Sequence, residues 1–197
     1  MPSQRHIMTK KIAVFASGSG SNAENICLYF KDSTTIEVSL IVCNVAKAGV
    51  ISRAERLGVE LLEINNKQAA DASFLEKALS QNQIDYIVLA GYLRMIPSGL
   101  ISKFPNRIIN IHPSLLPKYG GKGMYGQAVH QAVIQAREKE SGITIHFVNE
   151  VFDDGEVIFQ ATIPIPDIKS PDDLAAEIHK LEHYNYPRII EELIISK

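Results

Sequence analysis

The feature that most constrains the fold of this chain is a continuous apolar run at residues 86–90, with the sequence Tyr-Ile-Val-Leu-Ala. A short run that is apolar at every position is typical of a strand buried on both faces of a parallel sheet. Parallel strands need crossover connections, which are usually helices. Segments with helical periodicity do lie between this run and the other short apolar runs. The sequence therefore predicts an α/β fold: a mostly parallel open sheet with helices on both faces.

The boundaries of the expected elements follow from periodicity, turn residues and helix caps. Strands are predicted at residues 11–16, 37–43, 59–64, 86–90, 107–112, 142–149 and 156–163. Helices are predicted at residues 23–30, 50–57, 69–81, part of 93–103, 127–137 and from 170 to the end, where Pro187 could break the helix. The length suits one domain, so we expect a flexible N-terminal tail at residues 1–10 and a single domain at residues 11–197.

Charge and cysteine content argue against several classes of function. The formal net charge of -2 gives no support for binding to nucleic acid or to a membrane surface. Apolar runs in the sequence are shorter than the roughly 18 residues of a membrane span. Cys27 and Cys43 form no CxxC pair, so we expect neither a disulfide framework nor a zinc site, and a reducing cytoplasm is the simplest setting. His130, His146 and His179 form no metal-spaced cluster with carboxylates; no metal is predicted, and these histidines receive no chemical role.

The stretch at residues 110–117, Asn-Ile-His-Pro-Ser-Leu-Leu-Pro, is the strongest indication of function. It follows an apolar strand, and residues two apart on a strand share a face, so Asn110 and His112 would project together. They would do so at the carboxyl end of the strand, where open α/β sheets bind their ligands. An amide donor can hold a developing oxyanion, and an imidazole can move a proton near neutral pH. This pair indicates acyl-type chemistry.

A histidine in that role benefits from a carboxylate that orients it and supports its cationic form. Asp153, in a turn near another strand end, is the best candidate, and Asp154 is adjacent to it. The residue types alone do not choose between these two aspartates.

The loop at residues 17–22, Ser-Gly-Ser-Gly-Ser-Asn, joins the first strand to the first helix. Small residues in such a loop can aim backbone N–H groups at an anion, and the helix N-terminus adds a favourable dipole. The loop is neither a GxGxxG motif nor a P-loop. Its two interpretations are an anion site, with Ser19, Ser21 and Asn22 as added side-chain donors, and a plain capped turn.

Four segments resemble the family of folate-dependent glycinamide ribonucleotide formyltransferases, which act in purine synthesis. They are residues 15–22, 89–94, 110–118 and 146–153, and they occur in the family's order along the chain. The resemblance implies a Rossmann-like formyltransferase fold that transfers a formyl group from 10-formyltetrahydrofolate to the amine of 5-phosphoribosylglycinamide. It implies that the substrates are small molecules and that no metal takes part. It also implies that the protein is a monomer or homodimer that acts in one-carbon metabolism.

The resemblance also implies roles for individual residues. Asn110, His112 and Asp153 would be catalytic, with Asp153 rather than Asp154 in the catalytic place. Phosphate and ribose would be bound by Gly20, Ser21, Asn22 and Glu182. Folate would be bound by Leu93, Arg94, Met95, Ile96, Asn110, Val148, Asn149, Glu150, Val151, Phe152 and Asp153. Without the resemblance, Arg94 is more simply a surface arginine and Glu182 a residue of an exposed helix face.

Two departures from the family pattern affect the ligand contacts. The loop at residues 120–126 lacks a histidine that some relatives carry, and Tyr125 stands in its neighbourhood, close to Lys122. Residues 65–71 lack an arginine that some relatives use against the folate tail, where Lys67 could serve instead.

Two alternatives stay open. A formyltetrahydrofolate hydrolase would use the same cofactor but would activate water instead of an amine. A folate- or nucleotide-binding module would bind without catalysis, although the Asn110, His112 and Asp153 set argues against it. A formyltransferase acting on initiator transfer RNA would need a more basic surface than this composition provides.

Overall fold

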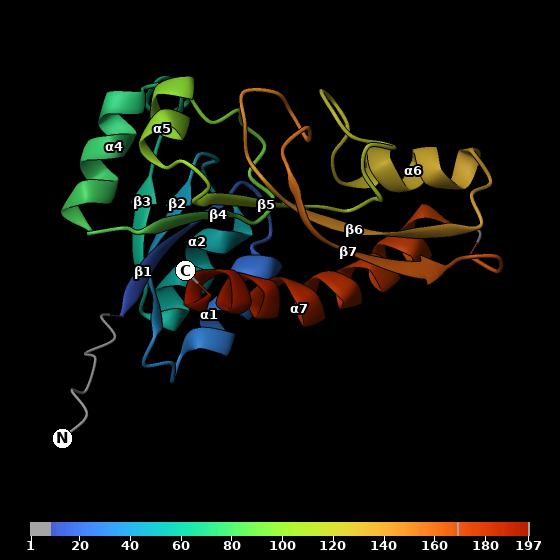
Figure 1. The fold of residues 1–197 in the computed structure, drawn as a ribbon, viewed down its shortest axis with the longest axis horizontal. Helices are drawn as coiled ribbons and strands as arrows, with labels where there is room; N and C mark the ends of the chain where they lie inside the picture. The colour runs from blue at the N-terminus through green and yellow to red at the C-terminus, as the bar shows by residue number, and fades with distance from the viewer. Residues whose placement is uncertain (1–8, 169, 197) are drawn as a thin grey trace.

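The strands of the chain lie in one mixed sheet. A computed structural model describes residues 9–168 and 170–196, and within them the sheet has seven strands in the order β3-β2-β1-β4-β5-β6-β7 (Figure 1). The strands are β1 (Lys10–Ala16), β2 (Ile36–Cys43), β3 (Glu60–Glu63), β4 (Tyr86–Leu89), β5 (Ile108–His112), β6 (Glu140–Phe147) and β7 (Val157–Pro164). The predicted tail at residues 1–10 falls mostly outside the described residues, and Lys10 already belongs to β1.

Helices connect most of the strands. They are α1 (Ser21–Phe30), α2 (Gly49–Leu57), α3 (Asn66–Ala69), α4 (Ala72–Gln81), α5 (Ser98–Lys103), α6 (Gln127–Gln135) and α7 (Pro171–Ile195). The prediction of one helix over residues 69–81 is wrong. The carboxylate of Asp71 accepts hydrogen bonds from the backbone N–H groups of Ser73 and Phe74, so it caps a new helix and separates α4 from α3.

The pairing of the strands divides the sheet into a parallel part and an antiparallel edge. Strands β3, β2, β1, β4 and β5 are parallel, whereas β6 runs antiparallel to β5 and β7 antiparallel to β6. The prediction of a mostly parallel open sheet is therefore confirmed. The order of connection reverses between β1 and β4, because β2 and β3 lie on one side and β5 on the other. Ligands of open α/β sheets bind beyond the carboxyl ends of the strands at such a reversal.

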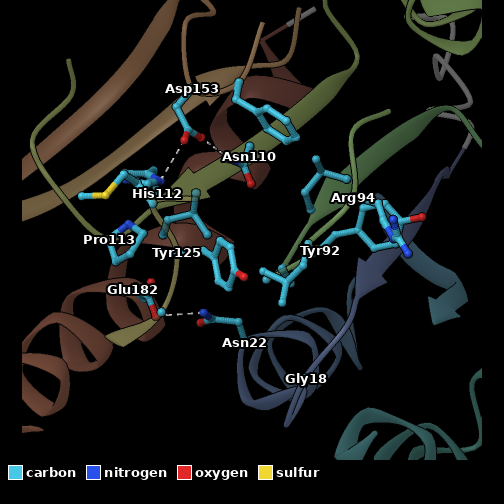
Figure 2. Close-up of a pocket in the computed structure, with 18 of the residues that line it drawn as sticks. Gly18, Asn22, Tyr92, Arg94, Asn110, His112, Pro113, Tyr125, Asp153 and Glu182 are labelled. Carbon is cyan, nitrogen blue, oxygen red and sulfur yellow. Dashed lines mark hydrogen bonds and ion pairs between the residues drawn. The ribbon is translucent and has the colours of Figure 1, made fainter. Parts of the chain in front are cut away.

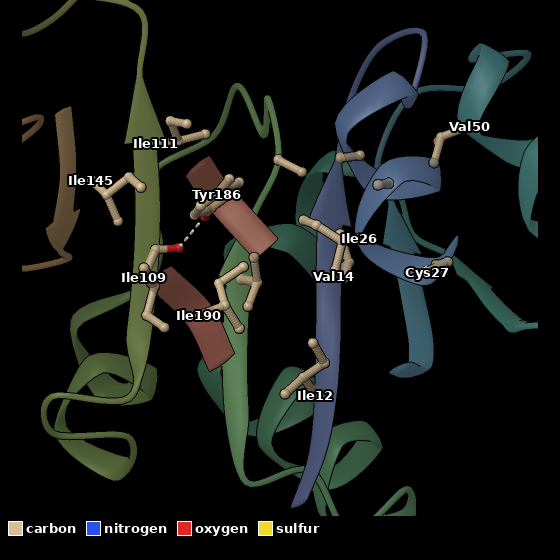
Figure 3. Close-up of a cluster of buried hydrophobic side chains, with 14 of the residues drawn as sticks. Ile12, Val14, Ile26, Cys27, Val50, Ile109, Ile111, Ile145, Tyr186 and Ile190 are labelled. Atoms are coloured by element: carbon tan, nitrogen blue, oxygen red, sulfur yellow. Dashed lines mark hydrogen bonds between the residues drawn. The ribbon is translucent and has the colours of Figure 1, made fainter. Parts of the chain in front are cut away.

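Alternate residues of β1 pack into two separate cores, one on each face of the sheet. Ile12 and Val14 pack on the face covered by α1 and α7, where Tyr186 and Ile190 of α7 are buried (Figure 3). Phe15 packs on the opposite face, which is covered by α4 and α5. The prediction of helices on both faces is confirmed. The strand ends, which carry the candidate functional residues, are thus held by packing from both sides.

Helix α7 continues through Pro187, which the sequence marked as a residue that could break it. A proline removes the hydrogen bond to the carbonyl four residues earlier, here that of His183. The side-chain amide of Asn25 on α1 donates to this carbonyl at 2.8 Å. Nearby, the hydroxyl of Tyr186 donates to the backbone oxygens of Leu89 and Ile109, and Figure 3 shows the bond to Ile109. Tertiary contacts therefore satisfy the carbonyl that the proline leaves and fasten the helix to the sheet.

Candidate active site

A cleft of about 760 Å³ lies beyond the carboxyl ends of β1, β4 and β5. Its volume falls within the range of sites that hold a small-molecule ligand, roughly 300–1,000 Å³. Nearly all the site residues predicted from the sequence line this cleft, although they lie far apart along the chain. The predicted residues in its wall are Gly20, Ser21, Asn22, Leu93, Arg94, Met95, Ile96, Asn110, His112, Val148, Asn149, Val151, Phe152, Asp153 and Glu182.

At one end of the cleft, Asn110, His112 and Asp153 come together (Figure 2). Asn110 and His112 lie two apart at the carboxyl end of β5, and Asp153 lies in the turn between β6 and β7. The Asp153 Oδ2 atom is 3.5 Å from His112 Nδ1, and Asp153 Oδ1 is 3.5 Å from Asn110 Nδ2. The carboxylate thus has one oxygen directed at each partner.

The imidazole of His112 is 4% exposed and lies between two oxygen acceptors. Its Nε2–H donates to the backbone oxygen of Tyr119 at 2.8 Å, and its Nδ1 faces Asp153. Both contacts are attractive together only when each ring nitrogen carries a proton. His112 therefore has an oxygen acceptor at each ring nitrogen, and Nδ1 is the nitrogen on the side of Asp153 and the cleft.

The surroundings of Asp153 keep its carboxyl ionised. Burial raises the pKa of this group, but the hydrogen bond and the charge of His112 and the Gly121 N–H together hold the pKa well below its ordinary value. The Gly121 N–H donates to Asp153 Oδ2 at 2.9 Å. Asp154 is exposed. The geometry therefore brings Asp153, and not Asp154, to the histidine.

His146, to which the sequence analysis gave no role, is buried against this group. It lies opposite Asn110 across the antiparallel β5–β6 pair. Its Nδ1–H donates to the backbone oxygen of Phe147 at 2.8 Å, which leaves Nε2 to accept from Asn110 Nδ2 at 3.1 Å. This contact orients the Asn110 amide so that its NH₂ group faces Asp153 and the cleft. A sequence pattern could have indicated this role. Thr144 and His146 lie two apart on β6, as Asn110 and His112 do on the neighbouring strand β5.

The opposite end of the cleft is formed by the loop after β1 and the first turn of α1. Gly20 precedes the helix with a φ of 78°, and a Cβ atom there would lie 2.5 Å from Val50 Cβ. Only glycine meets both conditions. The loop therefore packs directly on α2, and the N–H groups of the first turn of α1 stay available to an anion.

Asn22 and Glu182, 160 residues apart in the chain, pair at this end (Figure 2). The Asn22 Nδ2 atom donates to Glu182 Oε2 at 2.9 Å, and His179 Nδ1 lies 3.0 Å from the same oxygen. The Asn22 side chain, predicted as a donor for an anion, therefore donates one of its two amide hydrogens to Glu182 in this structure. Glu182 is 9% exposed, so it is also not the residue of an exposed helix face that it suggests by itself. Both of these contacts are made by its Oε2 atom.

Between these ends the cleft has an apolar wall. Leu93 and Met95 follow β4 and are about half exposed, and Val151 and Phe152 face the cleft from the turn after β6. The Ser17 hydroxyl accepts from the Leu93 N–H at 2.9 Å and joins the two strand ends. Exposed apolar side chains around a cleft are typical of a binding site for a flat, partly apolar ligand.

Two of the contacts considered from the sequence lie outside the cleft wall, whereas the loop at residues 120–126 lies at the cleft. Glu150 and Lys67 are exposed and are not part of the described cleft wall. Lys122 and Tyr125 do line it, and Tyr125 projects inwards although it is 55% exposed (Figure 2).

His130 of α6 is a lining residue of the cleft to which the sequence analysis gave no role. Its ring is buried, burial lowers its pKa, and its Nδ1 atom has no hydrogen-bond partner among the described residues.

The described residues contain neither a metal-binding cluster nor a membrane-spanning helix. Residues 9–168 and 170–196 contain no group of three or more His, Cys, Asp or Glu side chains placed to hold a metal ion. Over the same residues, no helix combines the length and apolar character needed to cross a membrane.

Comparisons with known proteins add independent findings. A family model described as formyl transferase matches residues 10–190. The chain is 39% identical over 191 residues to the phosphoribosylglycinamide formyltransferase of Bacillus subtilis, covering 94% of this chain and 95% of the relative. It is 39% identical over 187 residues to the chloroplastic phosphoribosylglycinamide formyltransferase of Arabidopsis thaliana, covering 92% of this chain. That match spans only 64% of the plant protein's length.

A solved structure shares the fold. The crystal structure of glycinamide ribonucleotide transformylase 1 from Geobacillus kaustophilus superposes with a TM-score of 0.85 at 38% sequence identity. The superposition covers 94% of this chain and 99% of the other.

Proposed function

The chain belongs to the formyl transferase family, and from that premise we propose that it transfers a formyl group from 10-formyltetrahydrofolate to the amine of 5-phosphoribosylglycinamide. The membership that the four sequence segments indicated is thus confirmed. In this proposal the protein is an enzyme of purine biosynthesis and one-carbon metabolism. A cytoplasmic location and a monomeric or homodimeric state, both predicted from the sequence, belong to the same proposal.

One observation carries the proposal: the cleft joins an anion-binding helix terminus to a group of Asn110, His112 and Asp153. A phosphorylated amine that is held by its phosphate at the first end would extend its amine toward the second. Glu182, which contacts Asn22 of the loop, would accept a hydrogen bond from a ribose hydroxyl. The apolar wall around Leu93 and Phe152 suits a pterin ring. The two substrates would then meet at the carboxyl end of β5.

The side chains supply the chemistry of formyl transfer. When the substrate amine attacks the formyl carbon, the carbonyl oxygen gains a negative charge. Asn110 Nδ2–H and His112 Nδ1–H would donate to that oxygen, and both donors are held in place beforehand by His146, Tyr119 and Asp153. Asp153 stabilises the charged imidazole throughout.

Collapse of the intermediate completes the transfer. The attacking nitrogen gives up a proton, and the folate nitrogen that carried the formyl group takes one up as its bond to carbon breaks. His112 Nδ1, or a water held by Asp153, would relay this proton between them. No net proton is gained by the enzyme, and the protein acts mostly by positioning the two substrates.

The test follows the conversion of 10-formyltetrahydrofolate to tetrahydrofolate by purified protein, with and without 5-phosphoribosylglycinamide. We expect conversion only when the ribonucleotide is present, together with formation of the N-formyl product. Glycinamide riboside, which lacks the phosphate, is the matched control and should react far more slowly. A large loss with the riboside would support the loop after β1 as the phosphate site.

Other outcomes would replace the proposal. Conversion without the ribonucleotide, with release of formate, would indicate a hydrolase. Binding of the folate without conversion in either mixture would indicate a binding module.

A further inference from the structure

The backbone at residues 119–121, here called the 119–121 segment, contacts both members of the His112–Asp153 pair. The oxygen of Tyr119 accepts from His112 Nε2–H at 2.8 Å. Two residues later, the Gly121 N–H donates to Asp153 Oδ2 at 2.9 Å. One short stretch of chain therefore binds the histidine from one side and the aspartate from the other.

We propose that the 119–121 segment is a positioning element for catalysis: it selects Nδ1 as the working nitrogen of His112 and keeps Asp153 aligned with it. The inference deepens the proposed function and rests on it. This role belongs to backbone groups, so it cannot be inferred from the residue types of the catalytic side chains.

The selection follows from the donor and acceptor requirements of imidazole. In a neutral imidazole one nitrogen carries the proton and the other accepts. The Tyr119 oxygen can only accept, so it keeps a proton on Nε2 and turns Nδ1 toward Asp153 and the cleft. Without that acceptor, the Asp153 carboxylate would favour the opposite tautomer, with the proton on Nδ1 and an unprotonated Nε2.

A side-chain bond anchors the segment from the far side. Tyr119 has a φ of 56°, a conformation that non-glycine residues adopt rarely and that neighbouring contacts must hold. Its hydroxyl donates to Glu138 Oε1 at 2.8 Å, and Lys118 Nζ donates to the same oxygen at 2.9 Å. Tyr119 and Lys118 are thus adjacent residues that share one acceptor, but only Tyr119 carries the carbonyl that contacts His112.

Gly120 allows the segment to approach the catalytic pair. A Cβ atom at this position would lie 2.5 Å from Leu116 Cδ2 and 3.2 Å from Asp153 Cβ. The Leu116 methyl group can turn away, but the Asp153 contact involves an atom fixed to the backbone. An alanine at this position should therefore push the 119–121 segment and Asp153 apart.

The experiment compares Tyr119→Phe with Lys118→Met, each of which removes one hydrogen bond to Glu138 Oε1. For Tyr119→Phe we expect kcat to fall about fivefold, the effect of one typical hydrogen bond, with the KM of both substrates unchanged. Lys118→Met should leave kcat unchanged, since the Lys118 side chain is exposed and its carbonyl does not contact His112. Gly120→Ala should lower kcat by about tenfold or more, again without a change in KM.

A second readout needs no turnover. Nitrogen-15 spectra of histidine-labelled protein report which ring nitrogen is protonated, and His112→Gln identifies the His112 signals. We expect a proton on Nε2 at every pH in the wild type and in Lys118→Met. In Tyr119→Phe, part of the neutral population should carry the proton on Nδ1 only.

Two results would overturn the proposal. One is an unchanged kcat and an unchanged His112 spectrum in both Tyr119→Phe and Gly120→Ala. The other is an equal loss of kcat in Tyr119→Phe and Lys118→Met, which would assign Glu138 a purely structural role. If the wild type transfers no formyl group, the proposed function fails, while the spectra still decide whether the 119–121 segment selects the nitrogen.

Discussion

The two ends of the cleft are built from different kinds of group. The phosphate end relies on the backbone of the loop after β1, where Gly20 has a φ of 78° and packs on Val50. The catalytic end relies on the side chains of Asn110, His112 and Asp153, which come from two separate regions of the chain. The phosphate end therefore presents backbone N–H groups to a ligand, whereas the catalytic end presents side-chain atoms.

The difference separates binding from chemistry. Changes at the catalytic end should lower kcat, because they alter groups that interact with charge formed during the reaction. Changes at the phosphate end should raise the KM of the ribonucleotide, because its phosphate and ribose do not change during the reaction. The variants below test whether changes at the catalytic end act on kcat and changes at the phosphate end act on the KM of the ribonucleotide.

The largest effect is expected for His112→Ala. Removal of the imidazole should lower kcat by at least about a hundredfold, since it takes away both an oxyanion donor and a proton carrier. The KM of the ribonucleotide should change by no more than about twofold. Steady-state kinetics with each substrate varied in turn would measure both quantities.

Because His112 is 4% exposed, its removal leaves a small cavity, and thermal unfolding should accompany the kinetics. His112→Gln, which retains most of the volume, is the matched variant. Wild-type turnover in either variant would remove His112 from the mechanism.

Asp153→Asn should lower kcat by about thirtyfold, which corresponds to the roughly 2 kcal/mol typical of a hydrogen bond to a charged group. Asparagine tolerates the left-handed backbone conformation at this position, where φ is 55°, so the turn should keep its shape. Asp154→Asn, one residue away and exposed, is the control and should have wild-type kcat. The reverse pattern would move the catalytic place to Asp154.

Glu182→Gln tests the other end of the cleft. The KM of the ribonucleotide should rise about tenfold, the loss of one charge-assisted hydrogen bond, while kcat stays close to wild type. Glu177→Gln on the same helix removes an exposed carboxylate whose partner is Lys180, and it should change neither quantity. A loss confined to kcat in Glu182→Gln would contradict the division between the two ends.

The smallest effect concerns stability in acid. The pKa of Asp153 lies well below its value in the unfolded chain, about 3.9, so its ionised form stabilises the fold above that pH. This contribution is lost as the pH falls through and below the unfolded value. The difference in unfolding free energy between the wild type and Asp153→Asn should therefore narrow by about 1 kcal/mol from about pH 5 to about pH 3. Denaturant titrations at each pH would measure it, and Asp154→Asn should show no such narrowing.

The elements predicted from the sequence were mostly those governed by local patterns. Continuous apolar runs identified β1 and β4, and the two-residue spacing on β5 placed Asn110 and His112 on one face. The break between α3 and α4 was missed, although Asp71 is a good capping residue, because helical periodicity continues on both sides of it.

The contacts that were missed involve residues far apart in the chain. His146 gained a role only through the antiparallel register that places it opposite Asn110. The bond of Asn22 to Glu182 could not be inferred from the phosphate loop alone. Pro187 remained within α7 because Asn25, on another helix, satisfies the carbonyl that the proline leaves unpaired.

By itself, the sequence determined the periodicities, the small-residue loop and the residue types at the strand ends, because these depend on neighbours within a few positions. The residue types did not distinguish Asp153 from Asp154, and the tertiary structure shows that Asp153 contacts His112 and which imidazole nitrogen faces the cleft. Both depend on the placement of Tyr119, Gly121 and the β6–β7 turn around the end of β5 to within about an ångström, the tolerance that such chemistry requires. Only the packing of the whole sheet and its helices sets positions that accurately.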